Sequence, residues 1–393
     1  MIDNFVFTSE SVTEGHPDKL CDQVSDAVVD HFLALEPCSK VRCECAVSGA
    51  IVFIAARFAS TVTVDLTHVA RKVIKRIGYD QPEFNPKNCS ILTSPQAAAI
   101  DESSRFDERT LSDSEINNIP ARNQVTVFGY ATNESPVLMP LPIFLANRLT
   151  QRLSAVRKER VLPYLMPDSK VQVGVEYKQR IPYRIHSITM EIHTRHLSNP
   201  NTEILKQDLL DAVVTPVFHS MAITPDEKTW VNVNPDGPYL GGPLNHSGLT
   251  GRKNAVDTYG EYARQSGKAL SGKDPMRVDR IGAYAARYAA KNLVAAGLAT
   301  SCEVAVSYAN GLAAPVSIMV NTFGTGRESD QHLTDLVQER FEFRPAGILK
   351  AFELRHLPAR HPDGFFQRLS SYGHFGREDI ALPWEKTGAI DPL

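Results

Sequence analysis

The sequence predicts an α+β fold made of three similar units, each a small sheet with helices on one face. A pair of strands followed by a helix recurs three times, over residues 41–77, 171–220 and 302–341. The units follow one another at a spacing of roughly 130 residues, which is too long for a solenoid repeat. The 393 residues also suffice for two or three domains with ample buried core.

The first unit begins with an amphipathic helix. Its apolar positions fall three to four residues apart, at Leu20, Val24, Val28, Phe32 and Leu35. Two strands are expected next, at 41–47 and 50–58, because short apolar runs there alternate with polar residues. A second helix is predicted over 65–77, where Gly78 ends it.

A long segment, residues 79–124, separates the first unit from the second. It is rich in Pro, Asn, Ser, Asp and Glu, so it is predicted to be irregular, with a closing lid as one alternative. A helix is expected within 136–162. Alternating apolar residues from 170 to 193 predict a hairpin that turns near Pro182, and a helix at about 202–220 completes the unit.

The third unit follows the same order. A long helix of small residues ends near Gly297, and two strands are predicted at 302–309 and 314–323. Ser329 is expected to cap a final helix that runs to Phe341.

Composition indicates a globular protein of ordinary polarity, with 42% hydrophobic and 22% charged residues. A net charge of −3 argues against nucleic acid or a membrane surface as partner. The six cysteines form no C-x-x-C pair, so buried thiols are favoured over metal ligands. The start of the chain lacks the pattern of a secretory signal, and no apolar run is long enough to span a bilayer. A reduced, cytoplasmic protein is therefore expected.

The stretch from 248 to 292 carries the clearest indication of chemistry. Its glycines allow close backbone approach to a ligand, at Gly248, Gly251, Gly260, Gly267 and Gly272. Four cations lie among them: Arg252, Lys253, Lys268 and Lys273. Asp274 is predicted to cap the next helix, so that Arg277 and Asp279 lie in its first turn, where helix N–H groups attract anions. A polyphosphate site with a metal ion is indicated; a solvated loop ahead of a structural helix is the alternative.

A second charged group, His16, Asp18 and Lys19, lies at the start of the first helix. Capping of that helix is one interpretation. The other assigns His16 and Lys19 to phosphate oxygens and Asp18 to Mg²⁺, which prefers one or two carboxylates plus phosphate.

Five segments together resemble the S-adenosylmethionine synthase (methionine adenosyltransferase) family. They are FTSESVTEGHPDK from 7, FGYATNES from 128, GLTGRK with VDTYG from 248, SGKDP with VDR and AYAARY from 271, and SYGHFGRE from 371. The resemblance covers nearly the whole chain, in order and with family-like spacing, which is far more specific than any single glycine motif.

This resemblance implies three interleaved domains around a pseudo-threefold axis, at residues 1–110, 118–238 and 239–384. It implies a homodimer, often a dimer of dimers, with active sites between subunits. The implied reaction moves the adenosyl group of ATP to the sulfur of methionine and then cleaves the tripolyphosphate to diphosphate and phosphate. Mg²⁺ and K⁺ are the implied cofactors.

The implied chemistry fits the residue types. A thioether sulfur carries no proton, so in-line attack at C5′ needs no general base, only alignment and stabilisation of the leaving tripolyphosphate. By resemblance, the polyphosphate is contacted by His16, Lys170, Arg252, Lys253 and Lys273. The nucleotide-contacting positions are Asp168, Ser169 and Ala269. Asp18 and Asp279 match the Mg²⁺ ligands, and Glu44 matches the K⁺ ligand.

Several positions depart from the family pattern. The family loop G-A-G-D-Q-G has lost its glycines at 120–125, and its aspartate is Asn123. Lys268 replaces a glycine, and Arg277 replaces a lysine and stays cationic. On the adenine side the family's Arg-Phe pair is lost, but Tyr239 can still stack on a base.

The amino-acid pocket departs most. Arg57 and His246 stand where the family holds the ammonium of methionine with a glutamate and an aspartate. The family glutamine that meets the methionine carboxylate falls on Ala99, with Gln96 close by. An ammonium 4 Å from Arg57 would meet a repulsion on the order of 1 kcal/mol or more. Either methionine binds through other groups, or the acceptor is an anionic thioether that lacks the free amine.

Three functions stay open at this point. The chain is a methionine adenosyltransferase, an adenosyltransferase for another thioether, or a non-catalytic nucleotide-binding subunit of an active homologue. The lost loop glycines motivate the third, and a relative that only hydrolyses tripolyphosphate is also conceivable. Retention of both metal carboxylates favours catalysis, because a binding-only protein would not need them.

Overall fold

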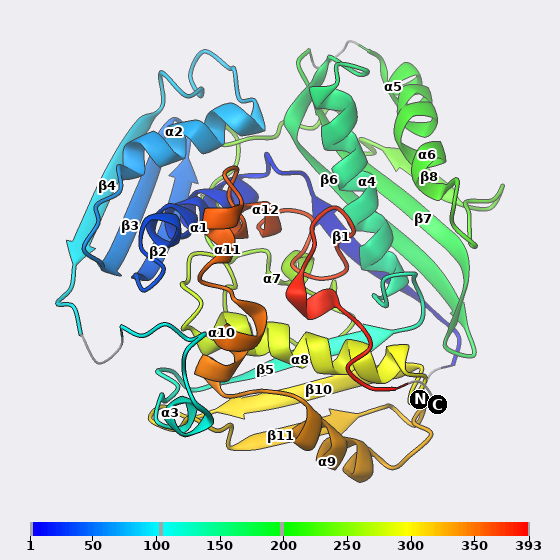
Figure 1. Cartoon of the computed structure of the whole chain (residues 1–393). Coiled ribbons are helices and arrows are strands. Elements are labelled where there is room, and N and C mark those ends of the chain that lie inside the picture. The colour runs from blue at the N-terminus through cyan, green and yellow to red at the C-terminus, as the bar shows by residue number, and fades with distance from the viewer. Residues whose placement is uncertain (1–2, 102–104, 197–199, 392–393) are drawn as a thin grey trace.

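A computed structural model describes residues 3–101, 105–196 and 200–391. The described residues form three sheets around the outside of the molecule (Figure 1). Three helices lie on the inner sides of these sheets: α1 (Pro17–Leu35), α4 (Leu141–Lys158) and α8 (Val278–Ala295). The predicted α+β class with three sheet-plus-helix units is confirmed.

The first sheet has the strand order β4–β3–β2–β9. Its hairpin, β2 (Lys40–Ser48) and β3 (Ile51–Ala59), matches the two predicted strands. β4 (Ser90–Ala97) pairs in parallel with β3, and β9 (Gly248–Leu249) pairs antiparallel with β2. α1 packs on β2 and contacts α2 (Leu66–Ile77), which ends at the left-handed Gly78 as predicted.

The second sheet has the order β1–β6–β7–β8. Its strands are β1 (Phe5–Val12), β6 (Leu165–Lys178), β7 (Ile181–Thr194) and β8 (Trp230–Val233). Neighbouring strands are antiparallel except β7 and β8, which are parallel. α4 packs on β1 and β6, and the helix predicted at 202–220 is α5 (Thr202–Leu209), a π-helical turn (Leu210–Val214) and α6 (Thr215–Phe218).

The third sheet is antiparallel, with the order β5–β10–β11. Its strands are β5 (Val125–Thr132), β10 (Ser301–Tyr308) and β11 (Ser317–Asn321). α8 packs on β5 and β10, and α9 (Asp330–Arg340) contacts β11. Gly129 lets β5 and α8 approach closely, because a Cβ there would overlap the backbone of Ala286 on α8.

The three units exchange strands cyclically. β1 precedes α1 but joins the sheet of β6 and β7; β5 precedes α4 but joins β10 and β11; β9 precedes α8 but joins β2 and β3. Each sheet therefore contains a hairpin and one strand from another unit, and the helix that precedes the hairpin packs on its inner face. This repetition is the interleaved, pseudo-threefold arrangement that the resemblance implied.

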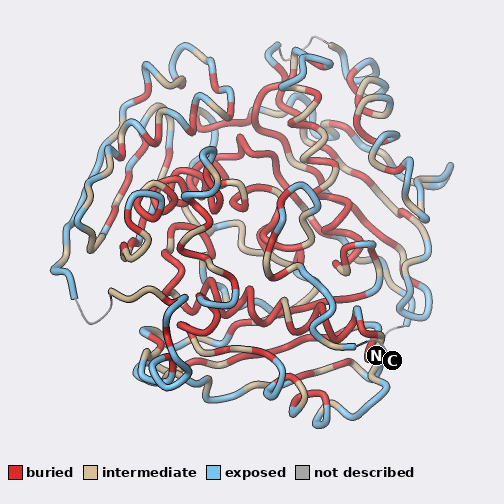
Figure 2. The backbone as a smooth tube through the Cα atoms, in the orientation of Figure 1, coloured by how far each residue is buried: buried red, intermediate tan, exposed pale blue. Residues whose placement is uncertain are grey.

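Shorter helices complete the C-terminal part of the chain. They are α7 (Asn254–Asp257), α10 (Pro345–Phe352), α11 (Leu357–Arg360), α12 (Phe366–Leu369) and a 3₁₀ turn (Pro383–Glu385). Buried residues gather on the inner helices and along the strands that they cover (Figure 2). Cys43 and Cys45 are buried thiols, as predicted. None of the helices in the described ranges combines the length and apolarity needed to cross a membrane.

Two expectations about local structure were wrong. The segment 79–124 is not irregular throughout, since it contains β4 and α3 (Asp113–Asn117). β4 escaped the prediction because almost all of it is exposed, so it shows no alternation of apolar residues. Asp274 does not cap α8; Arg277 occupies the cap position, and the Asp274 carboxylate accepts hydrogen bonds from the N–H groups of Val41 and Met276. Ser329 caps α9 as predicted.

Candidate active site

The N-terminus of α1 holds a buried histidine beside a buried carboxylate. His16 is the N-cap, and its Nδ1 accepts a hydrogen bond from the N–H of Asp18 at 3.2 Å. Burial, followed by repulsion from Lys253 and Lys170, lowers the pKa of His16 to about 2. The imidazole is therefore neutral, and because Nδ1 accepts, Nε2 carries the proton. The capping interpretation is thus correct, and it leaves Nε2–H available to a ligand.

Three predicted cations lie around this helix end, each with a carboxylate partner. Lys170 of β6 pairs with Glu191 of β7 at 2.9 Å, and Lys253 pairs with Glu10 of β1. Arg252 lies 3.6 Å from Asp18, whose carboxylate also accepts the N–H of Leu249 at 3.0 Å. Glu10 and Glu191 were not predicted: strand register places Glu191 opposite Lys170, and the tertiary fold brings Lys253, at the start of α7, to Glu10.

A buried carboxylate and two stacked rings adjoin these cations. Asp168 is fully buried, and burial raises its pKa to about 7. One of its oxygens accepts from the N–H of Gly242 at 2.7 Å, whereas Oδ1 has no hydrogen-bond partner in the described part of the chain. The ring of Tyr239 stacks on that of His246 at 5.8 Å, and Lys170 lies 5.0 Å from its centroid. We call these residues the first group: His16, Asp18, Asp168, Lys170, Tyr239, His246, Arg252 and Lys253. Ser169, predicted beside them, is buried and its backbone N–H bonds Thr13 Oγ1 at 2.8 Å.

A second group surrounds the start of α8 and continues onto the first sheet. We call these residues the second group: Arg42, Glu44, Arg57, Gln96, Asn123, Lys273, Arg277 and Asp279. Asp279 is buried in the first helical turn, with Lys273 Nζ at 3.4 Å from its carboxylate. Asn123 donates from Nδ2 to both carboxylate oxygens, at 3.0 and 3.1 Å. Burial lowers the pKa of Lys273. Arg277, at the helix cap, is half-buried.

The second group continues along the outer face of the first sheet. Arg42 of β2 forms a backbone bridge with Lys273 and an ion pair with Glu44 at 2.7 Å. Arg57 of β3 lies opposite Arg42 and is flanked on its other side by Gln96 of β4. A shallow depression there is lined by Arg42, Glu44, Ala55, Ala56, Arg57, Ser94, Pro95 and Gln96. Ala99 lies beyond the end of β4, so the structure places Gln96 rather than Ala99 beside Arg57.

The predicted acceptor residues are not gathered at one place in the chain. β9 joins β2 at Ala46, four residues from Arg42, which is about 13 Å along a strand. His246 belongs to the first group and Arg57 and Asn123 to the second. One acceptor site would therefore need a ligand that spans both groups, a movement of one group toward the other, or a second copy of the chain.

Two other expectations are corrected by packing. Lys19 does not face a phosphate site: it is fully buried and paired with Asp22 and Asp257. Gly248 and Gly272 allow chain packing instead of ligand approach, because a Cβ on either would overlap the backbone of Pro17 or Cys43. Ala269 is half-buried and packs against Gly251, and Lys268 is exposed.

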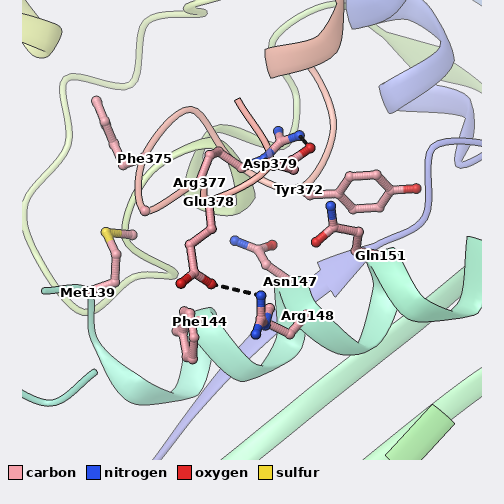
Figure 3. A pocket seen from close by; sticks show the side chains of 11 residues that line it. Met139, Phe144, Asn147, Arg148, Gln151, Tyr372, Phe375, Arg377, Glu378 and Asp379 are labelled. Atoms are coloured by element: carbon pink, nitrogen blue, oxygen red, sulfur yellow. Dashed lines mark hydrogen bonds and ion pairs between the residues drawn. The ribbon is translucent and has the colours of Figure 1, made fainter. Parts of the chain in front are cut away.

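The SYGHFGRE motif supports the fold. His374 is buried and its Nδ1 lies 2.8 Å from the hydroxyl of Tyr284 on α8. Other residues of the motif line a cavity of about 280 Å³ against α4 (Figure 3), where Glu378 pairs with Arg148 at 2.8 Å. None of the residues lining this cavity was among the predicted site residues.

Three family models match consecutive parts of the chain. The N-terminal, central and C-terminal domains of S-adenosylmethionine synthetase match residues 4–99, 118–239 and 240–386. The chain belongs to the S-adenosylmethionine synthetase family. The S-adenosylmethionine synthase of Gloeothece citriformis is 48% identical over 99% of this chain and 96% of its own length. Those of Synechococcus elongatus and Crocosphaera subtropica are 46% and 48% identical, over 100% and 98% of this chain and 98% and 95% of theirs.

Family membership makes the chain an enzyme of the adenosyltransferase type, and it confirms the resemblance and the fold expected from the sequence. The departures at Arg57, Asn123 and His246 stand within a chain that otherwise aligns over almost its full length with synthases of that name. Sequence reasoning missed Arg42, which joins Glu44, Arg57 and Lys273. An alternating strand with Arg42 and Glu44 on one face was the available signal.

Proposed function

We propose that this chain transfers the 5′-adenosyl group of ATP to the sulfur of methionine, forming S-adenosylmethionine with release of diphosphate and phosphate. The first group carries the proposal. It places a neutral histidine and three cations around one helix N-terminus, in a chain 46–48% identical to S-adenosylmethionine synthases. A helix start ringed by cations is an anion site, and the tripolyphosphate is the anion that this reaction must stabilise.

The carboxylate partners of the cations explain how ATP is received. Each cation is ion-paired with a carboxylate: Lys170 with Glu191, Lys253 with Glu10 and Arg252 with Asp18. Phosphate oxygens would exchange with these carboxylates, so the cations stay charged and positioned before ATP binds. His16 would donate a hydrogen bond from Nε2 to an oxygen of the polyphosphate. As a neutral imidazole it would act as a hydrogen-bond donor and not as an acid. Lys273, with the half-buried Arg277 close by at the α8 cap, would contribute from the second group.

Asp168 is suited to the nucleoside end. Its buried Oδ1 lacks a partner, and a ribose hydroxyl or the adenine amino group would supply the missing donor. Tyr239, 3.4 Å from the same carboxylate, offers a ring face for the base. Ser169 and Ala269 would line this end through their backbone.

The residues present fit Mg²⁺ at two positions. Asp18 and Asp279 are buried carboxylates, and each lies beside a cation that contacts phosphate in this proposal. Mg²⁺ prefers one or two carboxylates with phosphate oxygens, so these two side chains would hold it when ATP is bound. When bound, it would neutralise charge on the polyphosphate. Glu44, which the resemblance assigns to K⁺, is exposed and ion-paired with Arg42 at 2.7 Å, so K⁺ would have to displace that guanidinium.

A homodimer, or a dimer of dimers, would unite the two groups. Residues 1–110, 118–238 and 239–384 would form its three domains in each subunit, and a reduced cytoplasmic location is expected. The exposed face of the first sheet carries the second group together with apolar side chains, which suits a contact with another copy.

One experiment tests the function. The purified protein is incubated with ATP, Mg²⁺ and K⁺, and methionine is offered beside deaminated and anionic thioethers. The sulfonium product is measured by mass spectrometry and phosphate by a colorimetric assay. Methionine turnover supports the proposal. Phosphate without sulfonium would indicate a tripolyphosphate hydrolase, and neither product would indicate a non-catalytic nucleotide-binding subunit.

A different acceptor is the second candidate, and Arg57 motivates it. Its guanidinium and that of Arg42 lie on neighbouring strands in register, both exposed on the face that carries Gln96. Two guanidinium groups disfavour a free ammonium and attract an anionic thioether. Arg57→Glu combined with His246→Asp should then raise kcat/KM for methionine about tenfold. Arg195→Glu, at an exposed arginine just past the end of β7, is the control; equal kcat/KM in both variants would count against the idea.

A further inference from the structure

A cluster of three potential metal ligands lies outside both groups. Asp107 and Glu108 belong to the segment between β4 and α3, and His356 is the cap residue of α11. One atom from each, two carboxylate oxygens and the imidazole Nε2, lie within 4.8 Å of one another. The ligand types differ from those near Asp18 and Asp279, because an imidazole nitrogen takes part.

Glu108 is the centre of the cluster. It is 1% exposed, and one oxygen lies 3.3 Å from Arg355 Nη1. Its other oxygen, Oε1, faces His356 Nε2 at 3.5 Å. Over residues 3–101, 105–196 and 200–391, neither Oε1 nor Nε2 has a hydrogen-bond partner, and both are buried atoms. The separation is longer than a hydrogen bond, so two buried polar atoms face one another without satisfying each other.

The spacing matches two ligands of one ion. Metal–ligand bonds of 2.0–2.2 Å in a tetrahedral zinc site place neighbouring ligand atoms about 3.3–3.6 Å apart. His356 Nε2 lies 3.5 Å from Glu108 and 3.9 Å from Asp107 Oδ1. Mg²⁺ and Ca²⁺ take oxygen ligands, whereas imidazole with carboxylates suits Zn²⁺ and similar transition ions. We propose that Asp107, Glu108 and His356 bind a divalent transition-metal ion of the Zn²⁺ type.

Two arginines also face the cluster and must be accommodated. Arg355 holds the Glu108 oxygen that points away from His356, and this bond would orient the ligating carboxylate. Arg109 contacts Asp107 through Nη2 at 2.6 Å and through Nε at 2.9 Å. Its side chain is about half exposed, so it can turn to solvent when Asp107 Oδ1 ligates.

The ion would have a structural consequence for the enzyme. It would join the segment between β4 and β5, which leads to Asn123 of the second group, to α11 of the C-terminal part. The competing interpretation is an ion pair between Glu108 and a protonated His356, which would hold the same segment without a metal. The two differ in whether an added ion binds.

Cobalt binding tests the proposal. The full-length protein is treated with a chelator, returned to excess Mg²⁺ to occupy the oxygen-only sites, and titrated with Co²⁺ while visible d–d bands are recorded. One equivalent should give bands of a four-coordinate ion that Zn²⁺ then displaces. His356→Gln should weaken Co²⁺ binding at least tenfold, whereas His361→Gln at the other end of α11 and Asp279→Asn should leave it unchanged.

Three results would overturn it. They are the absence of bands in the wild type, equal affinity in His356→Gln, or loss of the bands in Asp279→Asn, which would move the ion to α8. Glu108→Gln serves as a second variant, with folding checked by circular dichroism. A rise in the thermal midpoint on adding Zn²⁺ to the wild type, lost in His356→Gln, should accompany the bands.

Discussion

His16 and Asp168 show how burial sets the chemistry of single residues. Both lie in the first group, and both have a pKa shifted toward the neutral form by desolvation. His16 is held as a neutral donor among cations, and Asp168 keeps one buried oxygen without a hydrogen-bond partner in the described part of the chain. Neither shift is visible in the residue type, because each depends on what the side chain is packed against.

Removal of the His16 imidazole should slow the chemical step more than it weakens ATP binding. His16→Ala is expected to lower kcat about 100- to 1,000-fold, because a positioned donor to the leaving group is lost. His31→Ala, on the same helix with its Nδ1 near the carbonyl of Ala27, is the control. Steady-state kinetics gives the values. An imidazole NMR signal of His16 that titrates near pH 6.5 would contradict the neutral assignment.

Asp168 makes stability depend on pH. Its pKa rises from 3.8 to about 7 on folding, so between these values the folded state binds a proton that the unfolded state lacks. Stability from this group is full below pH 4 and falls by up to about 1.4 kcal/mol per unit as pH rises toward 7. Asp168→Asn should reduce the decline in urea midpoint between pH 5 and pH 7.5. The pKa values of Asp22 and Asp30 are raised in the same way, so the variant should keep part of the pH dependence and the wild type should show the steeper one. Equal pH dependence of the urea midpoint in the two proteins would refute the assignment.

Segments gain their positions from neighbours that are distant in sequence. Residues 118–124 are tied to the turn after β10, where Ala121 exchanges backbone hydrogen bonds with Gly311 and Leu312. Asn123 is thereby held against Asp279. Gly248 brings β9 against the start of α1 and so places Leu249 beside Asp18. The predicted lid over 79–124 stays a prediction, although this part of it is anchored.

A side chain at Gly248 should disturb the first group. In Gly248→Ala the new Cβ would meet the backbone of Pro17, so the start of α1 must shift. We expect a loss of about 1–3 kcal/mol in the free energy of unfolding and weaker ATP binding. Denaturant unfolding and calorimetric titration measure the two effects. Ser247→Ala is the neighbouring control; wild-type behaviour in both variants would show that the close contact is unimportant.

Asn123→Asp should make stability depend on Mg²⁺. A carboxylate at this position would lose two hydrogen bonds to Asp279 and add a like charge beside it. The thermal midpoint should fall without Mg²⁺ and recover when Mg²⁺ binds between the carboxylates. Asn123→Ala removes the bonds without adding charge, so its midpoint should fall without such recovery. Equal responses of the two variants would argue against a metal at Asp279.

At the scale of the whole molecule, one face of the first sheet is exposed within the part of the chain that the structure describes. Ile51, Phe53, Leu92 and Leu249 are 43–55% exposed on strands of the first sheet. Four large apolar side chains exposed together suit the proposed contact with another copy of the chain, and Arg42, Glu44 and Arg57 lie on the same sheet.

Charge on this face should therefore separate subunits and stop the reaction. Phe53→Glu is expected to shift the mass measured by light scattering toward the monomer and to lower kcat at least 100-fold. Ile204→Glu places the same charge on an exposed apolar residue of α5 and should change neither. A wild-type protein that is monomeric and active would contradict the assembly argument.

Much of the fold was predictable because its hairpins and inner helices follow regular patterns. Residues 41–47 and 302–309 alternate apolar and polar positions. Ser329 caps the start of α9 and Gly78 caps the end of α2. β4 and β9 were not predictable, since one is almost wholly exposed and the other has two residues. In the candidate site, His16 and Asp18 could be found from their motif. Glu10 could not, because only the tertiary fold brings it beside Lys253, and the alignment of Arg57 with Arg42 and Gln96 depends on strand register.

The sequence by itself determined the family, the α+β units and the residue types of the phosphate end, since local periodicity and motifs depend only on near neighbours. Tertiary structure alone decided the cyclic exchange of β1, β5 and β9 and the burial of Lys19 away from ligand. It also decided the division of the site residues into two groups, the replacement of Ala99 by Gln96 beside Arg57, and the cluster at His356. The physical reason is the same in each case: pairing and desolvation depend on contacts between residues far apart in the chain.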